Sequence, residues 1–319
     1  KKVLLSPEKP REWALELAAQ LATSHGERKL AGQFVEAIEQ FLNDTPTANQ
    51  SHQQVSPTDA KKRLREQLQI PDGKKTLLFT MPMSAGDVFM ATAVVDSLKK
   101  KFPEHLILFA TDPKYASILK DNSNIFKIIH FDNWMTNVGF CESMFDEVYT
   151  PNLAIQTLQA NWVHGGKGRL LGDEMAAQCQ VEFGDYFIKT EPVEGLPEEY
   201  IVFHPGSGKG QWEARNYRHW RKVIKNIKKH TDLTIVQVGL EDDPTYEGCV
   251  DLRGRTTYNQ LASVVQNASC LFGIDSVTMH MAAAFRTSTV AIFGSSYATS
   301  TGPVLKHEGR NVTLLETKN

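Results

Sequence analysis

The 319-residue sequence predicts an α/β fold with two halves, each built on a parallel sheet, and a helical extension at the N-terminus. From residue 75 onward, short apolar runs alternate with amphipathic stretches, which is typical of parallel strands joined by crossover helices. The alternation stops over the glycine-rich residues 160–197 and restarts near residue 198. Two such halves would face each other across a cleft at the carboxyl ends of their strands, where open α/β sheets bind ligands.

Residues 1–74 have a different pattern from the rest of the chain. Residues 11–44 carry apolar side chains at helical spacing, and residues 45–60 are polar with two prolines, which is typical of a linker. Residues 56–70 predict a charged helix, with Ser56 or Thr58 as the cap. No chemical groups cluster here, so we expect a helical extension and linker over 1–74 that serves packing or oligomerisation.

The first half should span residues 75–197 and the second half residues 198–319. Apolar runs predict strands at 75–81, 105–111, 125–131 and 145–152, then at 199–204, 233–239, 249–254, 270–275 and 288–294. Helices are expected at 86–103, 114–122, 216–230, 257–268 and 278–285. The tail after residue 303 is expected to pack back on the first half.

Composition excludes several classes of protein. A net charge of −2 gives no global reason to expect a nucleic-acid or membrane partner, although a local basic patch stays open. The four cysteines lie far apart in the sequence, which argues against a zinc site and a disulfide framework and fits a reducing cytoplasm. No apolar run approaches the roughly 18 residues of a membrane span, and no signal-peptide pattern is visible.

Polar residues gather where four of the predicted strands end. After the first strand come Gly86 and Asp87, and Asp87 could be a helix-capping acid or a general base. After residue 204 a loop with three glycines includes Ser207, Gly208 and Lys209 and leads to Arg215. This loop could be a flexible surface segment, or its N–H groups and cations could bind phosphate.

The other two turns follow the strands at 233–239 and 270–275. Glu241 could accept hydrogen bonds from ribose or sugar hydroxyls, or be a solvated acid, and its neighbours Asp242 and Asp243 leave the choice of residue open. The turn after residue 274 holds Asp275, Ser276, Thr278 and His280 at the start of a helix. Free N–H groups there favour an anion, and four polar side chains exceed what capping requires.

Motifs for other chemistries are missing from the sequence. It has no Walker A loop, no G-x-G-x-x-G and no G-x-S-x-G nucleophile elbow. No local pair of carboxylates suggests glycoside hydrolysis, and the cleft turns have no Asp-x-Asp segment that could hold a metal. We therefore expect a reaction without a metal ion.

The four turns together resemble the ADP-heptose:lipopolysaccharide heptosyltransferase family, glycosyltransferase family 9-like inverting enzymes of the GT-B architecture. The likeness runs from about Leu77 to Pro303 and is strongest in residues 86–103 and 251–303. It implies two Rossmann-like domains, the first for the acceptor and the second for the nucleotide-sugar donor. Two positions depart from the family pattern, because Val277 replaces a Gly and Arg215 a Lys.

The resemblance also implies roles for individual residues. Asp87 would be the base that activates the acceptor hydroxyl, Ser207 a donor-phosphate ligand and Glu241 the acid that binds the ribose. Asp275, Ser276, Thr278 and His280 would form the turn for the donor sugar and diphosphate, with Lys209 or Arg215 stabilising the leaving group.

The expected function is metal-independent, inverting transfer of a heptose or related sugar to a hydroxyl of a lipopolysaccharide or other glycan acceptor. The co-substrate would be an ADP-sugar, with UDP- and GDP-sugars open, and no cofactor would be bound permanently. The protein would be cytoplasmic, with peripheral contact at the inner membrane face open and a nucleic-acid partner disfavoured. Three alternatives stay open: a transferase for a protein or modified-DNA acceptor, a GT-B-like sugar-nucleotide epimerase, and a non-catalytic nucleotide-binding relative.

Overall fold

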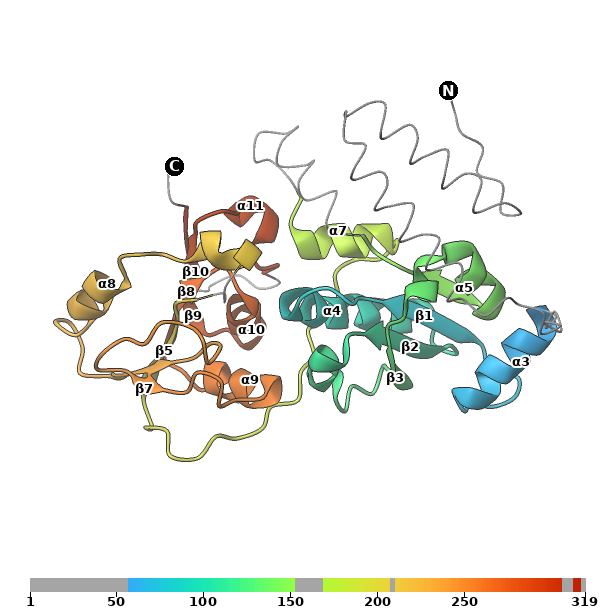
Figure 1. Cartoon of the computed structure of the whole chain (residues 1–319), viewed down its shortest axis with the longest axis horizontal. Coiled ribbons are helices and arrows are strands. Elements are labelled where there is room, and N and C mark those ends of the chain that lie inside the picture. Colours follow the sequence, from blue (N-terminus) through green and yellow to red (C-terminus); the bar gives the residue numbers. More distant parts are fainter. Residues whose placement is uncertain (1–56, 153–168, 207–209, 306–311, 317–319) are drawn as a thin grey trace, which may run out of the picture. The chain divides into compact units, whose positions relative to one another are not determined.

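The computed structural model describes residues 57–152, 169–206, 210–305 and 312–316 (Figure 1). The chain divides into two units, residues 1–60 and 61–319, and the second unit contains both sheets. The helices expected within residues 11–44, and the loop residues Ser207, Gly208 and Lys209, lie outside the described ranges.

The first sheet has four parallel strands in the order β3-β2-β1-β4. The strands are β1 Thr76–Thr80, β2 Leu106–Thr111, β3 Lys127–His130 and β4 Glu147–Tyr149. β1 is buried along its whole length, because it lies between β2 and β4 and packs its apolar side chains into the core. A sheet in which neighbouring strands are parallel needs crossovers, and helix α4, Ala85–Lys101, supplies the first of them.

The second sheet has six parallel strands in the order β10-β9-β8-β5-β6-β7. The strands are β5 Tyr200–His204, β6 Thr234–Gln237, β7 Val250–Asp251, β8 Cys270–Ile274, β9 Ser288–Phe293 and β10 Val312–Glu316. Strands β8, β5 and β6 are neighbours, so the turns that follow them lie at the same edge of the sheet. The α/β fold predicted from the sequence is confirmed.

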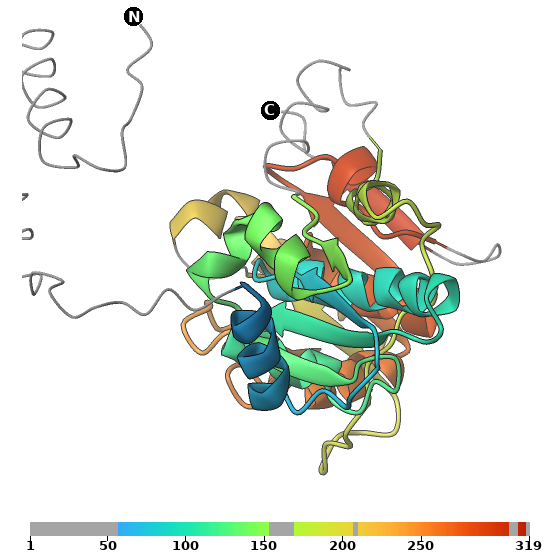
Figure 2. The same cartoon turned by 90° about the vertical axis from the view of Figure 1, so that its right-hand side faces the viewer.

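Helices connect the strands and cover the sheets. In the first half these are η1 Pro113–Leu119, η2 Asn133–Thr136, α5 Val138–Met144 and α7 Leu171–Gln178. In the second half they are η3 Gly210–Arg215, α8 Trp220–Ile227, α9 Tyr258–Gln266, α10 Val277–Phe285 and α11 Ala298–Thr301. Helix α3, Pro57–Gln67, lies beside the first sheet, where Lys61 approaches Asp146 and Lys127 donates to the Leu68 carbonyl (Figure 2).

One apolar cluster runs through both halves of the second unit. It includes Leu77 of β1, Phe89 of α4, Val202 of β5 and Met281 of α10, all of them fully buried or nearly so. Helix α4 packs against both α7 and α10, which places the start of α4 next to the start of α10. No helix in the described part of the chain is long and apolar enough to cross a membrane.

The structure departs from the sequence predictions in three places. Residues 160–197 were expected to be irregular, yet they contain α7, whose Gly172 packs against Phe183 and Val304 and weakens the helical pattern. Residues 113–119 form a 3-10 helix rather than the expected α-helix. The short strand β10 was not predicted, and it pairs with β9 within the second sheet.

Candidate functional site

Asp87 lies at the start of α4, at the carboxyl end of β1. Its side chain completes a capping box with Ser84: the Ser84 N–H and hydroxyl both donate to Asp87 Oδ2, at 3.1 and 2.8 Å. The capping role considered for this residue is therefore confirmed. All hydrogen bonds assigned to the half-buried Asp87 carboxylate within the described residues fall on Oδ2, which leaves Oδ1 for a further partner.

The environment of Asp87 also favours a base. Burial raises the pKa of the Asp87 carboxyl above its usual value, while the two Ser84 bonds and the charge of Arg215 oppose that rise. The charge of Asp275 raises the pKa of Asp87 further. Arg215 and Asp275 belong to the second half of the chain, so the structure brings predicted residues of both halves into electrostatic contact.

His280 and Gly86 meet where α10 packs on α4. A Cβ added to Gly86 would lie 3.6 Å from His280 Cδ2, at ordinary contact distance. The His280 side chain is buried and its Nδ1 has no hydrogen-bond partner among the described residues. Burial lowers the pKa of His280 to about 4, so the ring is neutral at pH 7.

Asp275 is buried at the end of β8, and its carboxylate fixes the loop that follows β9. The hydroxyl groups of Ser296 and Thr301 donate to Asp275 Oδ2 at 2.6 and 2.7 Å. Arg215 approaches the same oxygen at 3.9 Å and donates to the Asp275 carbonyl at 3.3 Å. Asp275 therefore holds Arg215 and this loop in place, a structural use that its predicted role in the donor turn did not include.

Helix α10 begins without a side-chain cap. Ser276 is the N-cap residue, but its hydroxyl accepts no N–H bond from the helix. The first N–H groups of a helix carry partial positive charge, and without a cap they are available to an anion. Val277 begins the helix, is not among the residues with positive φ and packs against the apolar cluster, so the backbone here does not require the family's Gly.

Thr278, which the sequence analysis placed in the donor turn, has a side chain that packs inside the protein. It is buried, and its hydroxyl is hydrogen-bonded to His204 Nδ1 at 2.8 Å. His204 ends β5, and burial lowers its pKa to about 4, against the opposing charge of Asp243. This hydrogen bond connects the start of α10 to the end of β5, so Thr278 stabilises the turn between β8 and α10.

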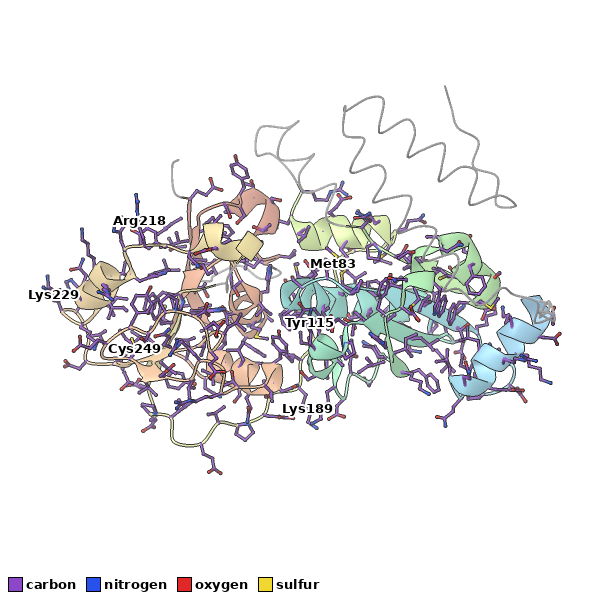
Figure 3. All side chains as sticks on the ribbon, viewed as in Figure 1. Met83, Tyr115, Lys189, Arg218, Lys229 and Cys249 are labelled. Atoms are coloured by element: carbon purple, nitrogen blue, oxygen red, sulfur yellow. The ribbon has the colours of Figure 1, made fainter. Side chains whose placement is uncertain are left out.

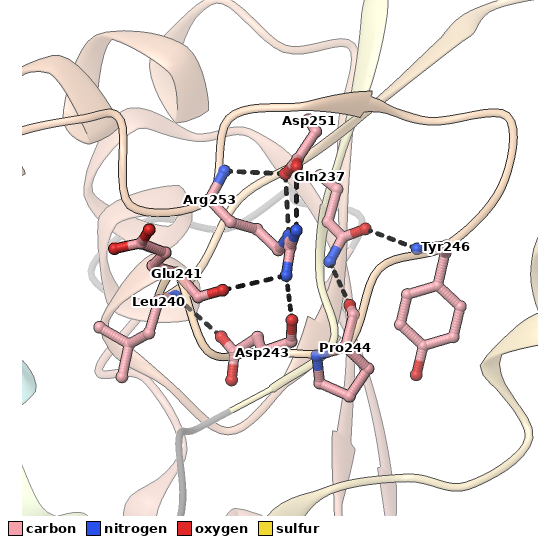
Figure 4. A network of polar contacts seen from close by, with 8 residues as sticks. All are labelled: Gln237, Leu240, Glu241, Asp243, Pro244, Tyr246, Asp251 and Arg253. Atoms are coloured by element: carbon pink, nitrogen blue, oxygen red, sulfur yellow. Dashed lines mark hydrogen bonds and ion pairs between the residues drawn. The ribbon is translucent and has the colours of Figure 1, made fainter.

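The turn after β6 presents Glu241 on its exposed side and buries Asp243 beneath it. Asp243 Oδ2 accepts the Leu240 N–H at 2.8 Å, which closes the turn (Figure 4). Gly206 and Gly239 both pack on the Asp243 carboxylate, because a Cβ on either residue would lie 2.4 Å from one of its oxygens. Among the three acids of this turn, Glu241 and Asp242 are both exposed, while the buried Asp243 holds the turn together.

The sequence analysis missed three residues that shape the site, His204, Arg253 and Ser296, and it named Asp243 only as an alternative to Glu241. His204 had a usable signal, since it is a polar residue directly between a buried strand and a glycine loop. Arg253 and Ser296 had none, because their partners Asp243 and Asp275 are brought to them only by the fold. Among the described residues, no group of three or more His, Cys, Asp or Glu side chains could hold a metal ion.

Comparison with protein-family models finds a match in the C-terminal half of the chain. Residues 167–318 match the sequence model of "Glycosyltransferase family 9 (heptosyltransferase)". No curated protein sequence matches the chain.

Solved structures match the fold over most of the chain. A glycosyl transferase family 9 protein from Veillonella parvula matches with TM-score 0.56 and 17% identity, over 77% of this chain and 88% of its own. ADP-heptose lps heptosyltransferase II of E. coli matches with TM-score 0.55 and 16% identity, over 75% and 90%. E. coli heptosyltransferase WaaC with ADP matches with TM-score 0.53 and 13% identity, over 76% and 93%. The chain therefore has the GT-B fold of these glycosyltransferase structures, and its residues 167–318 match the model of glycosyltransferase family 9.

Proposed function

We propose that this protein transfers a sugar from a nucleotide-diphosphate sugar to an acceptor hydroxyl, with inversion at the anomeric carbon. The observation that carries the proposal is the pairing of Asp87, whose pKa is raised by burial, with the uncapped start of α10 and with Arg215. The family match over residues 167–318 supports the same reaction class. A base next to an anion site is what a displacement with a diphosphate leaving group needs.

In this mechanism the acceptor oxygen attacks the anomeric carbon as the bond from that carbon to the diphosphate oxygen breaks. Asp87 takes the acceptor proton on Oδ1, while Oδ2 stays fixed by Ser84. The departing diphosphate gains negative charge, which the N–H groups at the start of α10 and the Arg215 guanidinium stabilise. His280 is neutral at pH 7 and lies beside Gly86, so it adds no positive charge to the site.

For the donor we propose an ADP-sugar, with Glu241 on the ribose and Ser207, Gly208 and Lys209 contributing phosphate contacts. The ADP in the WaaC structure and the exposed side chain of Glu241 support this choice. We also propose that transfer is metal-independent, with no permanently bound cofactor. The division into residues 1–74, 75–197 (acceptor domain) and 198–319 (donor domain) is part of the proposal.

The proposed acceptor is lipopolysaccharide or a related glycan, which the neighbour named ADP-heptose lps heptosyltransferase II supports. We propose a cytoplasmic protein that contacts the inner membrane face peripherally. The exposed face of α8 and its flanks supports such contact, because six exposed cations gather there, of which Figure 3 labels Arg218 and Lys229. They are Arg218, Arg221, Lys222, Lys225, Lys228 and Lys229.

Calorimetric titration with ADP, UDP and GDP, without added metal, tests the donor site. One nucleotide should bind, and Arg215→Ala should weaken it at least tenfold, since a hydrogen bond to a charged group contributes about 1.5–3 kcal/mol. Arg218→Ala removes the same charge from the exposed face of α8 and serves as the matched control. If none of the three nucleotides binds, or if Arg215→Ala binds as well as the wild type, the donor assignment is wrong.

Asp87→Asn tests the base. The amide oxygen can still accept the Ser84 bonds but cannot take a proton, so transfer should fall about 10²–10⁴-fold while nucleotide binding is retained. A raised folded-state pKa means that the ionised carboxylate opposes folding at neutral pH, so the thermal midpoint should stay equal or rise. Full transfer activity in Asp87→Asn would remove Asp87 from the mechanism.

A further inference from the structure

The guanidinium group of Arg253 donates hydrogen bonds to the backbone of the turn that carries Glu241. Arg253 Nη1 donates to the Glu241 carbonyl at 3.2 Å and also to the Asp243 carbonyl (Figure 4). Two carbonyl groups of one turn are thereby fixed on a single side chain, which comes from the segment after β7. The remaining side of the turn is closed by the bond from the Leu240 N–H to Asp243.

The Arg253 side chain is held in one orientation by Asp251. Its Nε and Nη2 donate to the two oxygens of Asp251 at 2.8 and 2.9 Å, a bidentate pair that fixes the plane of the guanidinium. The Arg253 side chain is only 12% exposed, so water screens these bonds weakly. Asp251 belongs to β7, which is hydrogen-bonded to β6, so the pair is anchored to the sheet.

The backbone around Arg253 also fits the Glu241 turn closely. The Gly254 N–H donates to the Gly239 carbonyl at 2.9 Å. Gly254 has φ +64°, and a Cβ there would lie 2.8 Å from the Glu241 Cβ. The segment Arg253-Gly254 therefore fixes the position of the turn relative to β7. It also fixes the direction of the Glu241 Cα–Cβ bond.

We propose that Arg253 is a positioning residue of the donor site, holding the turn after β6 so that the Glu241 carboxylate meets the donor ribose. The inference rests on the proposed function, because it assumes that Glu241 binds the donor. Four of the five Arg253 N–H groups donate to Asp251 and to the two carbonyl groups, so the proposal gives Arg253 no contact of its own with the donor. It acts on the donor through Glu241 alone.

This indirect role makes a distinct prediction. Removing the guanidinium leaves the turn free to shift, so Arg253→Ala should weaken nucleotide binding about tenfold, as should Glu241→Gln. If Arg253 acts only through Glu241, the double variant should be scarcely weaker than either single variant, instead of about 100-fold weaker than the wild type. A residue needed merely for folding would lower the thermal midpoint without this coupling.

The experiment is a double-mutant cycle measured by calorimetric titration with ADP. Arg253→Lys keeps the charge but cannot bridge Asp251 and both carbonyls, so it should not restore affinity. Arg255→Ala, which removes an exposed neighbouring arginine of the same charge, is the matched control and should bind as the wild type does. Asp251→Asn, which weakens the lock on the guanidinium, provides a milder variant if Arg253→Ala fails to fold.

The outcomes separate this proposal from the function on which it rests. Weak binding by Arg253→Ala and Arg253→Lys, with effects that do not add to that of Glu241→Gln, supports the positioning role. If Glu241→Gln weakens binding but Arg253→Ala does not, or if the two effects multiply, the positioning role is wrong and the donor site stands. A wild-type chain that binds no nucleotide overturns both.

Discussion

The two oxygens of the Asp87 carboxylate differ in their contacts: one completes a helix cap, and the other is the proposed catalytic atom. Oδ2 completes the capping box of α4, and this bond fixes the carboxylate relative to the helix start. In the proposed mechanism Oδ1 takes the acceptor proton, and burial raises the pKa of this carboxyl. The capping and catalytic interpretations of Asp87 are therefore compatible, because each uses a different oxygen.

Val277 is the residue at which the chain departs most from the family pattern, and a substitution shows whether it matters. Since Val277 starts α10 without positive φ and packs on the apolar cluster, Val277→Gly should leave nucleotide affinity within about twofold. It should destabilise the protein by about 1 kcal/mol through lost apolar contact. Chemical denaturation and ADP titration measure the two effects. A tenfold gain in affinity would show instead that Val277 obstructs the donor.

At the scale of elements, three turns at one edge of the second sheet are joined by buried polar contacts. The His204–Thr278 hydrogen bond links the end of β5 to α10, and Asp243 packs under the loops that follow β5 and β6. Buried polar networks of this kind fix one arrangement, because an unpaired member would be costly in the low-dielectric interior. The turns are therefore expected to move as a unit.

Two buried histidines in this region should make the stability depend on pH. His204 and His280 have folded-state pKa values of about 4, against an ordinary value of 6.5. Below pH 6.5 the unfolded chain binds protons that the folded chain excludes. Stability should therefore be level above about pH 6.5 and fall toward pH 4, by up to about 1.4 kcal/mol per pH unit for each histidine.

Urea unfolding at a series of pH values measures this slope. His280→Gln should reduce the slope by the contribution of one proton, while substitution of the exposed His219 by Gln serves as the control. Asp275 and Arg215 act on His280 with opposite signs, and Asp243 acts on His204, so these charges must be kept in every variant. A stability that stays level down to pH 4 would contradict the assigned burial.

The sequence predicted the helices and strands better than the side-chain contacts between them. All nine expected strands have counterparts, since a buried parallel strand leaves a continuous apolar run. β10 was not predicted because it is a short, half-exposed edge strand. α7 was not predicted because Gly172 interrupts its helical pattern. Glu241 and Asp87 could be proposed from their place after a strand, whereas the partners of Asp275 and Arg253 are set by tertiary contacts that no local spacing encodes.

At the scale of the whole molecule, charge is unevenly distributed. The chain has a net charge of −2, yet the exposed face of α8 and its flanks carries six cations. The opposite face of α8 carries the buried side chains Trp220 and Ile224. Since the apolar face of α8 is used inside the protein, membrane contact through this helix would be electrostatic rather than insertive. Such attraction requires anionic lipid and weakens as salt shortens the Debye length.

Vesicle sedimentation tests this surface. The protein should bind vesicles that contain anionic lipid and release them in 0.5 M salt, where the Debye length is about 4 Å. Lys222→Glu with Lys225→Glu should weaken binding at least about 25-fold, since each Lys near an anionic surface contributes about 1 kcal/mol. Lys62→Glu with Arg63→Glu makes the same charge change on the exposed face of α3. Equal loss in both variants would mean that binding is not specific to α8.

The central claim is that a nucleoside diphosphate binds at the uncapped start of α10, and hydrogen exchange tests it most directly. The nucleotide that binds tightest among ADP, UDP and GDP should slow exchange of the N–H groups of residues 276–278, because they would donate to phosphate. The turn at residues 239–243 should be protected with them. Tight binding that leaves residues 276–278 exchanging at the unliganded rate would contradict the account.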